Sequence, residues 1–386
     1  MKPALTGKQR MLNAYRGLPN DRVAIAPEFW YYIPAKVLGV DMLQFERDIP
    51  HWQALQATFR KYGTEGWGGV GGAEHNPAVS GDSRWEKISD TQQRLVGETR
   101  IGGQTFTSTR IYDVHEPSWT ETHPVKDPRD MARVFEIMHA PDVTHDFTGA
   151  VRAWEAVGED YLLECAVCSP FSDVLAHFMG FEAAVEYLLT QAPAVLERMQ
   201  ARYIENKVEL ARRACERTPF ESFFVGCSYA CNSLIGPNLW RTWDKPVIRA
   251  VAEEVHRHGR LLHIHFHGRC IETVRDFAEL GLDCVCPFER PPGGDVRGLD
   301  GLRTLERALR GRTTMNGNIH TVETLIRGTE ADVRREVGEI LEAFRGNPRV
   351  IVGTGDQVGL ETPEENIHAM VDECVRRSRD GWPSPG

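Results

Sequence analysis

Three histidines alternate with apolar residues in the middle of the chain. His263, His265 and His267 lie in Arg260-Leu-Leu-His-Ile-His-Phe-His-Gly268, a stretch that predicts a β-strand running into a glycine turn. Side chains two residues apart share one face of a strand, about 7 Å apart, so their rings can converge on one metal ion. We expect His265 and His267 to form this pair and His263 to lie deeper, in the core. The alternative is that one or two of them are satisfied core or surface histidines.

A carboxylate among aromatic residues ends the predicted first strand, residues 22–30. Glu28 is followed by Phe29, Trp30, Tyr31 and Tyr32. If this carboxylate is buried, burial raises its pKa. The alternative is a core aromatic cluster beside an exposed Glu28.

Strand and helix patterns alternate from about residue 161 to the end of the chain. Such units predict a parallel sheet. Seven or eight of them closed on themselves form a (β/α)8 TIM barrel, in which the active site lies at the carboxyl ends of the strands. Polar residues follow several predicted strands, and they are Glu28, His265, His267, Glu289, Asn316, Asn318 and Asp356. An open doubly wound sheet is the alternative, but neither Gly-x-Gly-x-x-Gly after the first strand nor a Walker A sequence is present.

The first part of the chain predicts additions to this repeat. Residues 64–83 are rich in glycine and predict a loop over the surface or the active site. Residues 93–114 alternate around Gly102-Gly103, which predicts an inserted β-hairpin. We therefore expect a single domain over residues 1–386, with an N-terminal extension and elaboration over about 1–150 and the main repeats over about 151–380.

Composition excludes several classes of function. The chain has 386 residues and a net charge of −10 without a basic run, so nucleic acid is not an expected partner. No apolar run reaches the ~18 residues of a membrane span, and the first residues lead into a helix without a signal-peptide core, so we expect a cytoplasmic protein. Nine cysteines, an odd number, indicate free thiols. Cys165-x-x-Cys168 has the spacing of a redox or zinc motif but lacks a second pair.

Several of these segments together resemble the uroporphyrinogen decarboxylase superfamily. The resemblance covers most of the chain and implies a (β/α)8 barrel. The segments that carry it are Arg10-Met-Leu-Asn-Ala-Tyr-Arg-Gly17, Asp21-Arg-Val23, His265-Phe-His-Gly268, Ala278-Glu-Leu-Gly-Leu-Asp283, Asn316-Gly-Asn-Ile319, Arg327-Gly-Thr-Glu-Ala-Asp-Val333 and Glu361-Thr-Pro-Glu-Glu-Asn-Ile367.

The superfamily has two main branches with different site residues. The cofactor-free decarboxylases hold their substrate's carboxylates with an arginine-rich segment after the first strand, where this chain has Glu28-Phe-Trp-Tyr-Tyr32. An acidic, aromatic segment cannot replace arginines as a carboxylate clamp. The corrinoid-linked methyltransferases use zinc held by His-x-Cys and a late Cys. Carried over, these ligands fall on His265, His267 and Asp356, so both thiolates are absent.

The resemblance therefore implies a zinc-dependent methyltransferase without a thiolate-rich site. A zinc ion held by two neutral histidines and one carboxylate is a stronger Lewis acid than one held by thiolates, which favours a methoxylated substrate. A corrinoid, carried by a partner protein, is the expected second substrate. Glu28 or Glu289 is expected as a fourth ligand or proton donor. The residues expected to contact the substrate are Trp30, Tyr31, Asn316 and Asn318.

Three other functions remain open from the sequence. A metal-dependent hydrolase also uses His-x-His and a late Asp, although such enzymes usually place the histidine pair on the first strand. The second is a cofactor-free decarboxylase, which the missing arginines disfavour. The third is a barrel that binds a corrinoid or metabolite without catalysis, and a bound metal with an open coordination position would disfavour it.

Overall fold

A computed structural model describes residues 4–383, apart from the side chains of residues 173 and 174. Its centre is an eight-stranded sheet in the order β1-β14-β13-β12-β11-β10-β9-β2, with every neighbouring pair parallel. The strands are β1 (Ala24–Glu28), β2 (Trp67–Val70), β9 (Leu162–Cys168), β10 (Ser222–Gly226), β11 (Leu261–Phe266), β12 (Cys284–Pro287), β13 (Thr314–Ile319) and β14 (Val350–Gln357). The two ends of this order meet where the Glu65 amide donates to the Ile25 carbonyl oxygen at 2.9 Å. The predicted TIM-barrel-like fold is confirmed.

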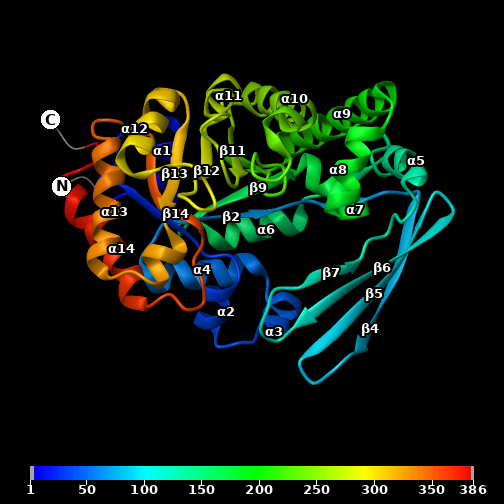
Figure 1. The fold of residues 1–386 in the computed structure, drawn as a ribbon, viewed down its shortest axis with the longest axis horizontal. Coiled ribbons are helices and arrows are strands. Elements are labelled where there is room, and N and C mark those ends of the chain that lie inside the picture. Colours follow the sequence, from blue (N-terminus) through cyan, green and yellow to red (C-terminus); the bar gives the residue numbers. More distant parts are fainter. Residues whose placement is uncertain (1–3, 384–386) are drawn as a thin grey trace.

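Helices between the strands cover the outside of the sheet (Figure 1). They include α4 (His51–Tyr62), α6 (Thr148–Val157), α9 (Pro193–Arg217), α10 (Gly236–Arg257), α12 (Gly298–Leu309), α13 (Glu330–Ala343) and α14 (Glu364–Ser378). Other helices are α2 (Tyr32–Leu38), α3 (Met42–Asp48), α5 (Pro128–Met138), α7 (His177–Met179), α8 (Phe181–Thr190), α11 (Val274–Glu279), and the π-helical turns η1 (Ser172–Ala176) and η2 (Thr321–Ile326). Across residues 4–383, none of these helices has both the length and the apolar character that crossing a membrane requires.

Helix α1 (Gly7–Arg16) packs against the beginnings of the barrel strands. Thr6 and Gln9 form a capping box that fixes its first turn. Met11, Leu12 and Tyr15 are buried in a cluster that also contains the first residues of several strands. The Tyr15 ring lies 5.6 Å from that of His263. Because α1 covers the amino ends of the strands, a small molecule reaches the interior from the carboxyl ends.

Strand β11 has the predicted alternation of faces. Leu262, Ile264 and Phe266 belong to the large hydrophobic core shared with the surrounding helices, and the Phe266 ring meets that of Trp240 of α10 edge-on at 5.5 Å. His263 and His265 are also buried, but they lie on the face that points into the barrel.

The prediction of a loop over residues 64–83 is wrong. This segment contains the barrel strand β2, the short strand β3 (Ala73–His75) and the beginning of β4 (Val79–Lys87). Gly68 of β2 packs closely against α4, since a Cβ there would lie 2.6 Å from a methyl carbon of Leu55 and would displace it. The glycines remove the β-branched side chains by which a strand is recognised in a sequence.

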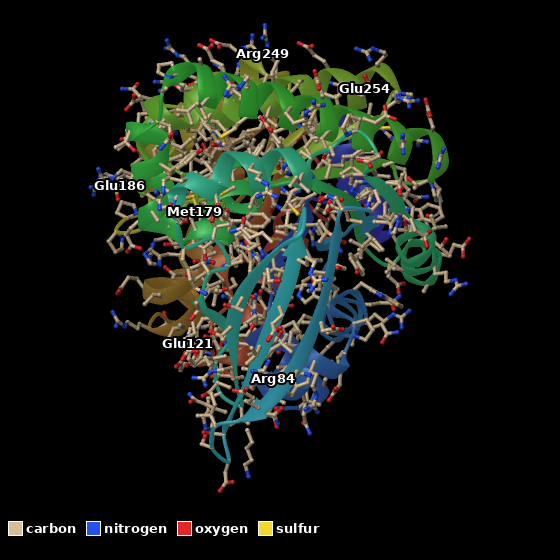
Figure 2. The ribbon with its side chains drawn as sticks, turned by 90° about the vertical axis from the view of Figure 1, so that its right-hand side faces the viewer. Arg84, Glu121, Met179, Glu186, Arg249 and Glu254 are labelled. Carbon is tan, nitrogen blue, oxygen red and sulfur yellow. The ribbon has the colours of Figure 1, made fainter. Side chains whose placement is uncertain are left out.

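The predicted hairpin is confirmed and is part of a larger insertion. Strands β5 (Gln92–Ile101) and β6 (Gln104–Asp113) join at Gly102 and Gly103, and they pair with β4 and β7 (Trp119–Thr122) in a four-stranded antiparallel sheet. We call these four strands the inserted sheet. It projects from the barrel in Figure 1, and Figure 2 shows Arg84 and Glu121 along its length, below Met179 of α7. A two-stranded ribbon of β3 and β8 (Thr144–Asp146) lies next to it in sequence.

Candidate metal and active site

Two histidines and one glutamate bring their donor atoms together at the carboxyl ends of β1 and β11. The ligand atoms of Glu28, His265 and His267 all lie within 4.8 Å of one another. The Nε2 atoms of His265 and His267 are 2.6 Å apart, and a Glu28 oxygen lies 3.7 Å from His265 Nε2. Nitrogen and carboxylate oxygen atoms are the ligands that catalytic zinc sites use. The residues present therefore fit a zinc-type ion with three protein ligands.

Glu289, in the loop after β12, holds His267 in the orientation that such a site needs. Its Oε1 atom accepts from His267 Nδ1 at 2.6 Å and from the Gly268 amide at 2.8 Å. A carboxylate on Nδ1 fixes the tautomer and directs Nε2 toward a metal. Burial disfavours the charged ring, but the hydrogen bond to Glu289 and the charges of Glu28 and Asp356 outweigh it and raise the pKa of His267 to about 9.

His265 is oriented from the other side by a chain of buried groups. Its Nδ1 atom lies 3.1 Å from the sulfur of Cys286, which lies 3.0 Å from Nε2 of His263. His263 Nδ1 in turn lies 2.8 Å from Glu164. Burial, with the charges of His267 and His263, lowers the pKa of His265 well below its usual value. A neutral His265 that donates from Nδ1 to the sulfur presents the lone pair of Nε2 to the site.

The Glu28 carboxyl group is buried, and this burial is the main influence on its pKa. Burial raises its pKa to about 8, against the opposing effects of the His267 charge and of a hydrogen bond from the Trp30 side chain, and the charge of Asp356 raises it further. The Glu28 amide donates to the Thr354 hydroxyl at 2.9 Å, which ties the end of β1 to β14. Without a bound cation, Glu28 therefore holds its proton at neutral pH.

Asp356, predicted as the third metal ligand, lies beside this group rather than in it. Its Oδ1 atom accepts from the Gln357 amide at 2.6 Å. Burial raises its pKa, while the charge of His267 lowers it. Asp356 and Glu289 both line a cavity of about 240 Å³ over the ends of β12, β13 and β14. The carboxylate that joins the two histidines in the structure is that of Glu28, and a ligand role for Asp356 stays a prediction.

The predicted substrate residues occupy two kinds of position. Trp30 stacks on His51 at 5.0 Å and meets Trp67 edge-on at 5.3 Å, so it forms a wall next to Glu28. Tyr31 lies one layer further out, with its ring 6.2 Å from that of His51.

Asn316 and Asn318 are buried within β13 instead of lining the open mouth. Asn316 Oδ1 fills the space above Gly353, where a Cβ would lie 2.3 Å from it. The Asn318 amide donates to the Phe288 carbonyl oxygen at 3.0 Å. Both side chains therefore join β13 to its neighbours, and contact with a substrate stays a prediction.

Sequence reasoning missed three residues of this site: Glu164, Cys286 and Trp67. The Trp67 ring meets His263 edge-on at 4.8 Å and lies 5.6 Å from His265. Cys286 pairs with His265 in register, and both residues point into the barrel. The alternation in the segment Asp283–Glu289 could have placed Cys286 on that face. Trp67 and Glu164 had no comparable signal, because one was assigned to a loop and the other stands in an apolar run.

Within residues 4–383, the group with the geometry of a metal site contains no cysteine. All nine cysteines are buried thiols outside disulfide bonds, as the odd count indicated. Cys165 and Cys168 lie in β9 within the hydrophobic core, where burial raises the pKa of Cys165 to about 12.

Comparisons with known proteins agree with this architecture. Residues 113–377 match the family model described as Uroporphyrinogen decarboxylase (URO-D). A uroporphyrinogen decarboxylase of Thermus thermophilus is 28% identical over 214 residues, which are 55% of this chain and 54% of that protein. One from Paraburkholderia phytofirmans is 31% identical over 90 residues, 22% of this chain and 24% of that protein. The longest of these matches thus spans about half the length of the curated relative.

Among solved structures, a methyltransferase from Methanosarcina mazei superposes with a TM-score of 0.65 and 15% sequence identity, covering 97% of this chain and 99% of that one. At that identity the likeness concerns the fold. The family model, in contrast, covers well over half of the sequence, including β9 to β14 and their helices. The chain belongs to the uroporphyrinogen decarboxylase family.

Proposed function

We propose that this protein is a metal-dependent methyltransferase that moves a methyl group between a small methoxylated compound and a corrinoid. The observation that carries the proposal is the convergence of Glu28, His265 and His267 at the barrel mouth, with Glu289 behind His267. The fold shared with a methyltransferase supports it. A partner protein would supply the corrinoid, and zinc is the metal that this donor set favours.

The residues of the mouth divide the work of the reaction. Zinc held at this site would act as a Lewis acid toward an ether oxygen and so stabilise the leaving alkoxide or phenoxide. Glu289 and Cys286 keep the two imidazoles turned toward one point. Trp30, whose side chain hydrogen-bonds Glu28, lies beside this carboxylate. Asp356, whose pKa burial raises, stands where it can hold a proton for the departing oxygen.

Cofactor-free decarboxylation is the second candidate, because the family model and the curated relatives bear that name. It would need cationic side chains to hold several substrate carboxylates. The segment that follows β1, Glu28–Tyr32, supplies a carboxylate and aromatic rings instead. Hydrolysis is a third use of two histidines and a carboxylate, and only the reaction product separates it from methyl transfer.

The test measures zinc content and methyl transfer in the same preparations. We expect about one zinc ion per chain in the wild type, retained in the control His75→Ala, which changes an exposed histidine of β3, and lost in His265→Ala and Glu28→Gln. The same two substitutions should abolish the methylation of cob(I)alamin by methoxylated aromatic compounds. The absorbance of the cobalamin measures this reaction.

Three results would redirect the proposal. Wild type that stays free of metal after zinc is added back excludes the Lewis-acid mechanism and favours decarboxylation. Zinc lost in Asp356→Ala but kept in Glu28→Gln moves the carboxylate ligand to Asp356, as the sequence predicted. Hydrolysis of the methoxy compound without methylcobalamin formation would favour the hydrolase.

A further inference from the structure

A cavity outside the cluster of Glu28, His265 and His267 lies between the inserted sheet and the helices that follow β1. Its volume is about 290 Å³, near the lower end of the range for small-molecule sites. Aromatic rings form much of its wall, from Trp30, Tyr31, Phe45 and Tyr112. Flat apolar walls of this kind suit a planar ring, which packs against them by stacking and edge contacts.

Arg110 of β6 brings a positive charge to this cavity. Its side chain lines both this cavity and a neighbouring one of about 300 Å³ under the inner face of the inserted sheet. Burial, then the charges of His123 and Arg110, lower the pKa of His177 of α7, and the Arg110 charge also acts on Tyr31. Arg110 therefore borders both cavities.

The guanidinium of Arg110 is held in place while its terminal nitrogens stay available. Its Nε atom donates to the Ser118 hydroxyl at 2.8 Å, and its Cζ atom lies 5.8 Å from the centre of the Tyr112 ring. Within residues 4–383, no ion pair or further hydrogen bond engages it. An arginine fixed in this way presents two parallel N–H donors, the geometry that matches a carboxylate.

Glu46, a carboxylate that lines the same cavity, already accepts hydrogen bonds from the protein. Glu46 of α3 accepts from the Ser118 amide at 2.7 Å and from the Ser118 hydroxyl at 2.8 Å, one bond to each oxygen. Glu46 thus anchors Ser118, which anchors Arg110. Within residues 4–383, the terminal nitrogens of Arg110 are charged donors of this cavity without a protein partner, so they offer a charge-assisted contact to an anionic ligand.

We infer that this cavity binds the carboxylate end of an aromatic acid, with Arg110 as the anchor for the carboxylate and the aromatic wall around the ring. Trp30 links the cavity to the cluster of Glu28, His265 and His267, since its side chain hydrogen-bonds Glu28 while its ring lines the cavity. The inference rests on the proposed function only in naming this acid as the methoxylated methyl donor. Binding of the acid does not depend on methyl transfer.

Calorimetric titration tests this inference with 4-methoxybenzoate and its neutral analogue 4-methoxybenzamide. We expect the acid to bind wild type at least about tenfold more tightly than the amide, as a charge-assisted pair implies. Arg110→Met should remove this difference, and Arg110→Lys should keep part of it. The control Arg100→Met makes the same change on the outer face of the same sheet and should leave it intact.

The inference is overturned if acid and amide bind equally, if neither binds, if phenyltrimethylammonium binds more tightly than the acid, or if folded Arg110→Met keeps the full preference for the acid. If Arg110→Met fails to fold, an undiminished preference in Arg110→Lys overturns the anchor instead. The two proposals also fail separately. Arg110-dependent binding of the acid to a protein that neither holds zinc nor transfers methyl groups refutes the proposed function alone. Methyl transfer that is as fast from neutral methoxybenzene as from the acid refutes the carboxylate anchor alone.

Discussion

Two histidines on one face of the same segment, His263 and His267, each have a carboxylate on Nδ1, yet their surroundings differ. Glu164 lies 2.8 Å from His263, and both side chains are fully buried. Glu289 lies 2.6 Å from His267, where the side chains are 20% and 16% exposed. We call these the inner pair and the outer pair.

The difference between the pairs lies at the opposite ring nitrogen. Nε2 of His263 meets the thiol of Cys286, a group that can donate to it or accept from it. Nε2 of His267 meets another imidazole nitrogen, that of His265, with Glu28 nearby. The inner pair is thus complete within the protein, whereas in the outer pair the charged His267 donates from Nε2 to Nε2 of His265, and a bound cation would take the place of that proton. The same residue types build structure at one depth and a site at another.

The largest effect expected from this comparison is on the inner pair. Glu164→Ala should lower the free energy of unfolding by about 3–5 kcal/mol, the range for breaking a buried pair, because His263 and Ser222 both lose a partner. Urea unfolding measures this. The control Glu182→Ala changes an exposed carboxylate of α8 and should stay within about 0.5 kcal/mol. An unfolding curve unchanged by Glu164→Ala would erase the distinction between the pairs.

The outer pair should respond in metal affinity instead. Glu289→Gln removes the charge behind His267 and should weaken zinc binding about 10- to 100-fold, the usual cost of losing such a partner. Competition with a chelating dye measures it. Glu323→Gln is the matched control, since Glu323 lines the same cavity but pairs with Arg327 at the surface. Equal affinities in the two variants would mean that Glu289 does not support a metal site.

Much of the barrel could be predicted from the sequence because its signal is local. Leu262, Ile264 and Phe266 mark β11 by alternation, and Gly102 with Gly103 marks the turn of the hairpin. Strand β2 was missed because its glycines lack the side chains by which a strand is recognised, and the close packing of Gly68 on Leu55 of α4 is visible only in the fold. Strands β4 and β7 of the inserted sheet carry mostly exposed residues. Their sequences therefore lack the alternation of apolar and polar residues that marks a half-buried strand.

The site was predictable in its parts but not in its assembly. His265 and His267 share a strand face, so their meeting follows from local geometry. Glu28 and Asp356 lie in the last residues of β1 and β14, two strands that pair side by side. Which carboxylate reaches the histidines depends on how the barrel curves and on the bulge between Ala26 and Glu28. Arg110 was also beyond local reasoning, because only the fold brings the inserted sheet to the mouth.

A third pair of the same kind, at the surface, should show the smallest effect. His256 Nε2 lies 2.8 Å from Asp283, and the histidine side chain is 35% exposed. The hydrogen bond to Asp283 raises the pKa of His256 above its ordinary value near 6.5. A raised pKa means that the pair stabilises the fold fully below about pH 6.5 and loses this contribution as pH rises through the folded-state pKa.

Solvent screening should hold the contribution of this pair to the free energy of unfolding below about 1 kcal/mol. The difference in unfolding free energy between wild type and His256→Gln should therefore shrink from pH 5.5 to pH 8.5, and a difference that grows over this range would show that His256 is held in its neutral form, as His265 is in the barrel.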